Sequence, residues 1–161
     1  MTVRNLRAAT LLMTSFAAHA QSPEVTVATP WSRATPQGAS TGAAYLTLTS
    51  PAGDTLTGVS SPAAKMAQVH EMKMDGNVMR MREVQGGLAL PPGTTVTLQP
   101  NGLHIMLMGL TAPLKQGQMV KLHLTFAKAP PEDVTAPIGP LGSTRPPGQA
   151  GSAVMPGMPT H

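Results

Sequence analysis

The chain has 161 residues, a formal net charge of +4 and no cysteine. This length suffices for one domain with a single hydrophobic core. The basic residues form no cluster with interleaved aromatic residues, which excludes the common classes of nucleic-acid-binding protein. The absence of cysteine excludes disulfides. It also excludes structural cysteine–zinc, iron–sulfur and blue-copper sites, because all of these need thiolate ligands.

The first twenty residues have the organisation of a secretory signal peptide. Arg4 and Arg7 precede an apolar run over residues 8–18, and Ala18-His19-Ala20 supplies small residues at a cleavage site. The run is too short to cross a membrane, and no other run approaches the length of about 20 apolar residues that a crossing requires. We expect cleavage after Ala20. Since no lipobox cysteine is present, we also expect release of the mature protein into the periplasm.

Residues 21–128 are predicted to form one all-β domain. Short β-prone runs alternate with turn residues such as Asp75-Gly76-Asn77. The run 119–127 alternates most clearly, and it places His123 on the face exposed to water. About eight strands at this spacing predict an antiparallel sandwich or barrel. The expected strands are 24–28, 43–49, 55–59, 67–73, 78–84, 95–98, 104–108 and 119–127.

Residues 129–161 differ in composition from the predicted domain. They are rich in proline and glycine, have few bulky apolar residues and show no periodicity. This composition predicts a disordered or polyproline-like tail. The tail ends in a segment that carries Met155, Met158 and His161.

Imidazole and thioether side chains are concentrated between residues 70 and 108. His104 and Met106 stand two residues apart and share one face of any strand, while the aliphatic residues beside them take the other. His70 and Met81 flank a turn, so a hairpin would bring them near each other. Cu(I) favours neutral thioether and imidazole ligands, whereas Zn(II) rarely accepts methionine. The pattern therefore predicts a soft-metal site formed by His70, Met81, His104 and Met106.

The other methionines of the domain have different expected roles. Met72 and Met108 are candidates to shield the ion without binding it. Met66, Met74 and Met79 are interpreted as packing residues, because methionine commonly fills gaps in apolar cores.

The segments 70–84 (HEMKMDGNVMRMREV) and 90–110 (LPPGTTVTLQPNGLHIMLMGL) resemble the periplasmic copper(I) chaperone family PCu(A)C. Its pattern is a histidine, a methionine about ten residues later, and His-x-Met after a gap of a little over twenty. Trp31-Ser32-Arg33, residues 42–46 and Ser61-Pro62-Ala63 are also similar to the family. The resemblance implies a cupredoxin-like Greek-key β-sandwich that binds one Cu(I) at an exposed site. By position, the ligands would be His70, Met81, His104 and Met106.

The resemblance also implies a function. Members are metallochaperones, not enzymes, that deliver copper to the binuclear CuA centre of cytochrome c oxidase, sometimes alongside a Sco-type protein. We expect a monomer that binds no nucleic acid and inserts into no membrane. A copper buffer or resistance protein and a metal-free exported binding module stay open as alternatives. Some members carry a tail with methionine and histidine, so Met155, Met158 and His161 are a candidate second element for Cu(I) or Cu(II). The other interpretation of this tail is a terminus with incidental methionines.

Overall fold

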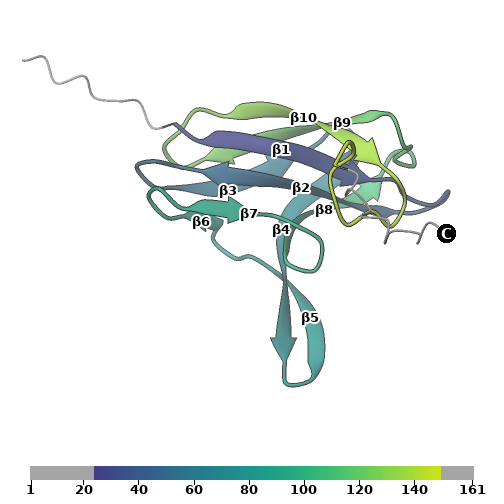
Figure 1. The fold of residues 1–161 in the computed structure, drawn as a ribbon, viewed down its shortest axis with the longest axis horizontal. Helices are drawn as coiled ribbons and strands as arrows, with labels where there is room; N and C mark the ends of the chain where they lie inside the picture. Colours follow the sequence, from purple (N-terminus) through teal and green to yellow (C-terminus); the bar gives the residue numbers. More distant parts are fainter. Residues whose placement is uncertain (1–23, 150–161) are drawn as a thin grey trace, which may run out of the picture.

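The computed structural model describes residues 24–149, and all regular elements in this range are β-strands (Figure 1). No helix in this part of the chain is long and apolar enough to cross a membrane. The strands are β1 (Thr26–Arg33), β2 (Thr41–Thr49), β3 (Asp54–Ser60), β4 (Ala64–Asp75), β5 (Val78–Glu83), β6 (Leu88–Leu90), β7 (Thr95–Thr97), β8 (Leu103–Leu110), β9 (Met119–Phe126) and β10 (Glu132–Gly139).

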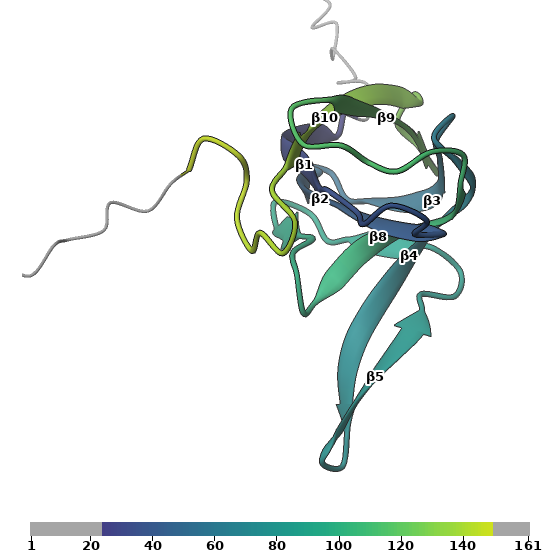
Figure 2. The ribbon, with the colours of Figure 1, turned by 90° about the vertical axis from the view of Figure 1, so that its right-hand side faces the viewer.

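The strands form one sheet that closes on itself. Its order is β5-β4-β8-β2-β1-β10-β9-β3-β6, with β7 paired to β2. A pairing of Val59 in β3 with Ala67 in β4 closes the sheet, which wraps around one core (Figure 2). The pairings are antiparallel except that of β1 with β10, which is parallel. The predicted all-β sandwich is confirmed, with ten strands in place of about eight.

Strand β9 shows how the sequence pattern builds the core. Val120, Leu122, Leu124 and Phe126 are buried, and the residues between them point outward. Successive side chains of a strand lie on opposite faces, so the alternation places each apolar residue inside. The expected surface position of His123 is confirmed, since its side chain is 47% exposed; its Nδ1 lies 2.7 Å from a carboxylate oxygen of Asp133.

The segment after Lys128 is the main correction to the sequence analysis. Its first part was predicted to be a disordered tail, but it contains β10, which lies between β1 and β9 (Figure 1). Val134, Ala136 and Ile138 alternate along this strand and are buried in the core. The high content of proline and glycine concealed this short alternation. The folded domain therefore does not end at residue 128.

Two predicted segments lie outside the described residues. They are the signal peptide at residues 1–20 and the end of the tail, with Met155, Met158 and His161. The structure also adds β6, whose Leu88 and Leu90 are buried and which the sequence analysis did not predict.

Strands β4 and β5 form a hairpin that projects beyond the rest of the sheet (Figure 2). The first part of β4 pairs with β8, whereas its second part pairs with β5 through a turn at Gly76, which has a φ of 64°. Glycine adopts this left-handed conformation without steric cost. The hairpin predicted around Asp75-Gly76-Asn77 is confirmed, and it carries the candidate ligands His70 and Met81, whereas His104 and Met106 lie on β8.

Candidate metal centre

Strands β4, β5 and β8 place the candidate ligands on one face of the sheet. In the β4–β8 pairing His70 lies opposite His104, and in the β4–β5 pairing Met72 lies opposite Met81. Direct cross-strand partners share a face, and so do residues two apart on one strand. Met106 therefore lies on the same face as these four residues. Ile105 and Leu107, on the opposite face of β8, are fully buried in the core.

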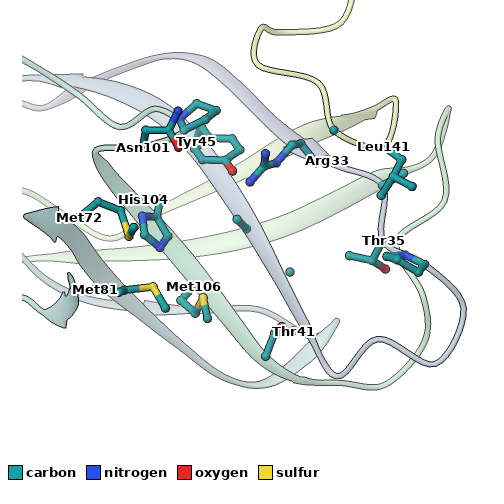
Figure 3. Close-up of a pocket in the computed structure, with 16 residues that line it drawn as sticks. Arg33, Thr35, Thr41, Tyr45, Met72, Met81, Asn101, His104, Met106 and Leu141 are labelled. Carbon is teal, nitrogen blue, oxygen red and sulfur yellow. The ribbon is translucent and has the colours of Figure 1, made fainter. Parts of the chain in front are cut away.

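This face borders a pocket of about 500 Å³. Three thioethers and one imidazole line one end of it, from Met72, Met81, Met106 and His104 (Figure 3). Arg33 lines the other part of the pocket, together with Thr35 and Leu141. The soft donor atoms are thus gathered at one end of an open pocket, where an ion and an incoming ligand could both reach them.

His104 is buried and held in one orientation. Its Nδ1 lies 3.0 Å from the carbonyl oxygen of Gly102. Since a carbonyl oxygen can only accept a hydrogen bond, this contact favours the neutral tautomer that has the proton on Nδ1 and a free lone pair on Nε2. The same carbonyl accepts a hydrogen bond of 3.2 Å from the backbone N–H of Met72. One backbone oxygen therefore positions both the imidazole of His104 and the strand that carries the thioether of Met72, which are both candidate ligands.

His70 lies beside this pocket but is not part of its lining. Its ring centroid is 6.0 Å from that of His104. Both ring nitrogens are buried, and neither has a hydrogen-bond partner among the described residues. Burial, followed by the nearby His104, lowers the pKa of His70 below its ordinary value, although Glu83 acts in the opposite direction. A buried imidazole held neutral with an unpaired nitrogen is suited to bind a metal ion.

The structure thus brings the four predicted ligands close together and adds a fifth candidate. Met81, His104 and Met106 line the pocket, His70 adjoins it, and Met72 lines it directly. Spacing alone placed Met72 only among residues that could shield the ion. The signal that could have found it is its place as the direct partner of Met81 in the hairpin register.

The interpretation of three further methionines as packing residues is wrong. Met66, Met74 and Met79 are exposed by 54%, 56% and 45%. They lie at alternating positions of β4 and β5, on the face that is turned away from the core. The expectation rested on the frequent occurrence of methionine in cores. It failed because residue type alone does not show that the hairpin extends beyond the core.

The donor set determines which ions fit. Thioether sulfur and neutral imidazole are soft or borderline ligands and add no negative charge, so they match a soft monovalent ion such as Cu(I). Within residues 24–149 no group of three or more His, Asp or Glu residues is placed to hold a metal ion. The methionines are therefore what makes this face a candidate metal centre.

Comparisons with known proteins identify the family and the fold of the chain. The model of the family described as "Putative lipoprotein LpqE-like" matches residues 25–138. The chain is 39% identical over 83 residues to "Putative lipoprotein Lxx21020" of Leifsonia xyli subsp. xyli (strain CTCB07). That match covers 52% of this chain and 50% of the relative, so the chain matches about half the length of this curated protein.

Solved structures provide the second comparison. The chain is 33% identical to the Cu(I)-form solution structure of DR1885 from Deinococcus radiodurans, with a TM-score of 0.59 over 76% of this chain and 83% of that one. The copper-bound PCuAC domain from PmoF2 is 24% identical, with a TM-score of 0.59 over 72% and 92% of the two chains. The apo PCuAC domain from PmoF1 is 24% identical, with a TM-score of 0.60 over 72% and 93%. The chain therefore belongs to the LpqE-like family and has the cupredoxin-like fold of PCuAC domains, which confirms the family resemblance seen in its sequence.

Proposed function

We propose that this protein is an exported Cu(I)-binding metallochaperone. The observation that carries the proposal is the pocket end where Met72, Met81, Met106 and the free Nε2 of His104 meet. Similar solved structures support it, since they include a copper-bound PCuAC domain and a Cu(I) form of DR1885. The names of the LpqE-like relatives, which describe lipoproteins, support export. We place this protein in the periplasm.

The ligand set suits a carrier. Thioethers do not protonate, so only the histidines make Cu(I) affinity depend on pH. The ion can leave by stepwise exchange, in which a donor atom of the acceptor replaces one thioether at a time and the ion stays at +1. An acceptor with thiolates binds Cu(I) more strongly than neutral sulfur does, which gives transfer a direction. The open pocket leaves room for the incoming donor.

Competition against a Cu(I) chelator under anaerobic conditions tests copper binding. We expect one tightly bound Cu(I) at the pocket, and a loss of affinity of about 10-fold or more in His104→Ala and Met106→Ala variants. His123→Ala is the matched control, because His123 is exposed on β9 and bonded to Asp133. Equal affinity in all three variants would refute the proposed site. Met72→Leu and His70→Ala variants then decide which of these two residues binds the ion together with Met81, His104 and Met106.

The acceptor that we propose is the CuA-bearing subunit of cytochrome c oxidase, with a Sco-type protein as a second partner. A strain without this protein should lose oxidase activity at low copper and regain it when copper is added. If oxidase activity is normal and only copper tolerance falls, the protein is a buffer or resistance protein.

The C-terminal segment is a second, independent proposal. Met155, Met158 and His161 supply the same soft donor types as the pocket, and a tethered site would raise the local copper concentration near it. Removal of residues 150–161 should then lower the copper stoichiometry and leave pocket affinity unchanged. An unchanged stoichiometry would show that the methionines of this segment are incidental.

A further inference from the structure

The outer end of the β4–β5 hairpin carries a pair of methionines that the pocket does not use. Met74 and Met79 are direct cross-strand partners, and both are largely exposed. Neither lines the pocket. Two large apolar side chains at the end of a projecting hairpin add nothing to the core and expose apolar area to water at a cost in free energy. Packing therefore does not explain them.

The register places this pair next to the pocket ligands. Met72 and Met81 form the adjacent cross-strand pair, on the same face of the hairpin and one step nearer the pocket. Direct partners have Cβ atoms about 5 Å apart, and adjacent pairs on one face are about 6.7 Å apart along the strand. Each methionine side chain has three rotatable bonds, so the sulfur atoms of a pair can converge on one ion.

Most charges of the hairpin lie on its other face; the exception is Glu83, which pairs with His70 at the inner end of the methionine face. Asp75 lies 3.1 Å from the side chain of Arg80 and 3.4 Å from that of Arg82. These residues alternate with the methionines, so they point away from the methionine face. The part of that face formed by Met72, Met74, Met79 and Met81 contains no carboxylate or guanidinium side chain. It is a neutral, sulfur-rich surface, which suits a soft monovalent ion and offers little to a hard or highly charged one.

We propose that Met74 and Met79 form a second, outer site for Cu(I), with a third thioether from Met72 or Met81, through which the ion enters and leaves the pocket. This inference rests on the proposed function of the pocket. The outer site lacks imidazole and is exposed to water, so it binds Cu(I) more weakly than the pocket. Transfer between the sites replaces one thioether by another, and neither a proton nor an electron moves. This end of the hairpin projects away from the rest of the sheet, where a partner can reach it (Figure 2).

Methyl NMR of the mature chain, with methionine labelled at the ε-carbon, tests the inference. Ag(I) serves as a soft monovalent probe that does not change oxidation state. The first equivalent should shift the methyl signals of Met81 and Met106, and later equivalents should shift those of Met74 and Met79. The methyl signal of Met119, which is 62% exposed on β9, is the control and should not move. Signals of Met74 and Met79 that stay fixed, or that move only together with that of Met119, would overturn the inference.

A double variant tests the role in transfer. Met74→Leu with Met79→Leu keeps the apolar volume and removes the sulfur. We expect the loss of one weakly bound Ag(I), unchanged pocket affinity and slower transfer of Cu(I) to a thiol acceptor, relative to Met119→Leu. An unchanged stoichiometry would overturn the outer site, and an unchanged transfer rate would overturn its role in transfer. If the pocket methyl signals fail to respond to Ag(I), the proposed function fails as well, so the two failures are distinguishable.

Discussion

The side chain of Asp54 links the start of β3 to the segment that precedes β10 by hydrogen bonds. Its carboxylate is buried and accepts hydrogen bonds from three backbone N–H groups, at 2.7 Å from Thr55, 3.0 Å from Lys128 and 2.8 Å from Ala129. Burial by itself raises the pKa of this carboxyl group. The three N–H donors and the Lys128 charge outweigh that effect and hold the pKa of Asp54 below its ordinary value.

Asp54→Asn should therefore destabilise the protein at neutral pH. The amide NH₂ replaces one acceptor by a donor, which leaves at least one buried N–H without a partner at a cost of about 1–3 kcal/mol. The remaining hydrogen bonds lose their charge assistance, which adds roughly 1 kcal/mol. The smaller cost of burying a neutral amide offsets part of this. We expect a net loss of about 1–3 kcal/mol in the free energy of unfolding.

Urea unfolding of the apo protein across a pH series measures this loss. Because the folded pKa of Asp54 is lowered, its contribution is complete above about pH 4 and disappears as the pH falls through the folded pKa. The difference between wild type and Asp54→Asn should therefore shrink in acid. Asp133→Asn is the matched control, since Asp133 is exposed and its loss should cost less than about 0.5 kcal/mol. A loss of that small size for Asp54→Asn at pH 7, or a difference that does not change with pH, would refute the reasoning.

Two further predictions concern His70 and β10. Because burial lowers the pKa of His70, the unfolded chain binds its proton more readily, so apo stability should fall as the pH drops below about 6.5. Histidine NMR should show its midpoint below that value, and a midpoint above it would contradict the burial argument. A mature chain that ends at residue 128 lacks β10 and should not fold, because β1 and β9 lose the strand between them. A chain that ends at residue 149 should give a folded NMR spectrum, and equal spectra for the two would refute a structural role for β10.

Local alternation in the sequence was sufficient where a strand is half buried. The pattern of β9 predicted its buried side and the exposure of His123, and the HIMLM run predicted that Ile105 and Leu107 form the core face of β8. The alternation of β10 was not detected, because it covers only three buried residues in a segment rich in proline and glycine. Strand β10 is stabilised by its pairing with β1 and β9, and the residues of β10 alone do not reveal that these two strands lie beside it.

The sequence by itself determined which donor atoms a soft-metal site in this chain could use. A chain without cysteine, with methionines and histidines at strand spacing, can build a soft-metal site only from neutral thioether and imidazole. The tertiary structure decided which of these side chains meet. The hairpin register set Met72 opposite Met81 and left Met74 and Met79 exposed, and the β4–β8 pairing set His70 opposite His104. These contacts depend on pairing between distant strands, and a shift by one residue would reverse every face, so spacing along the chain does not specify them.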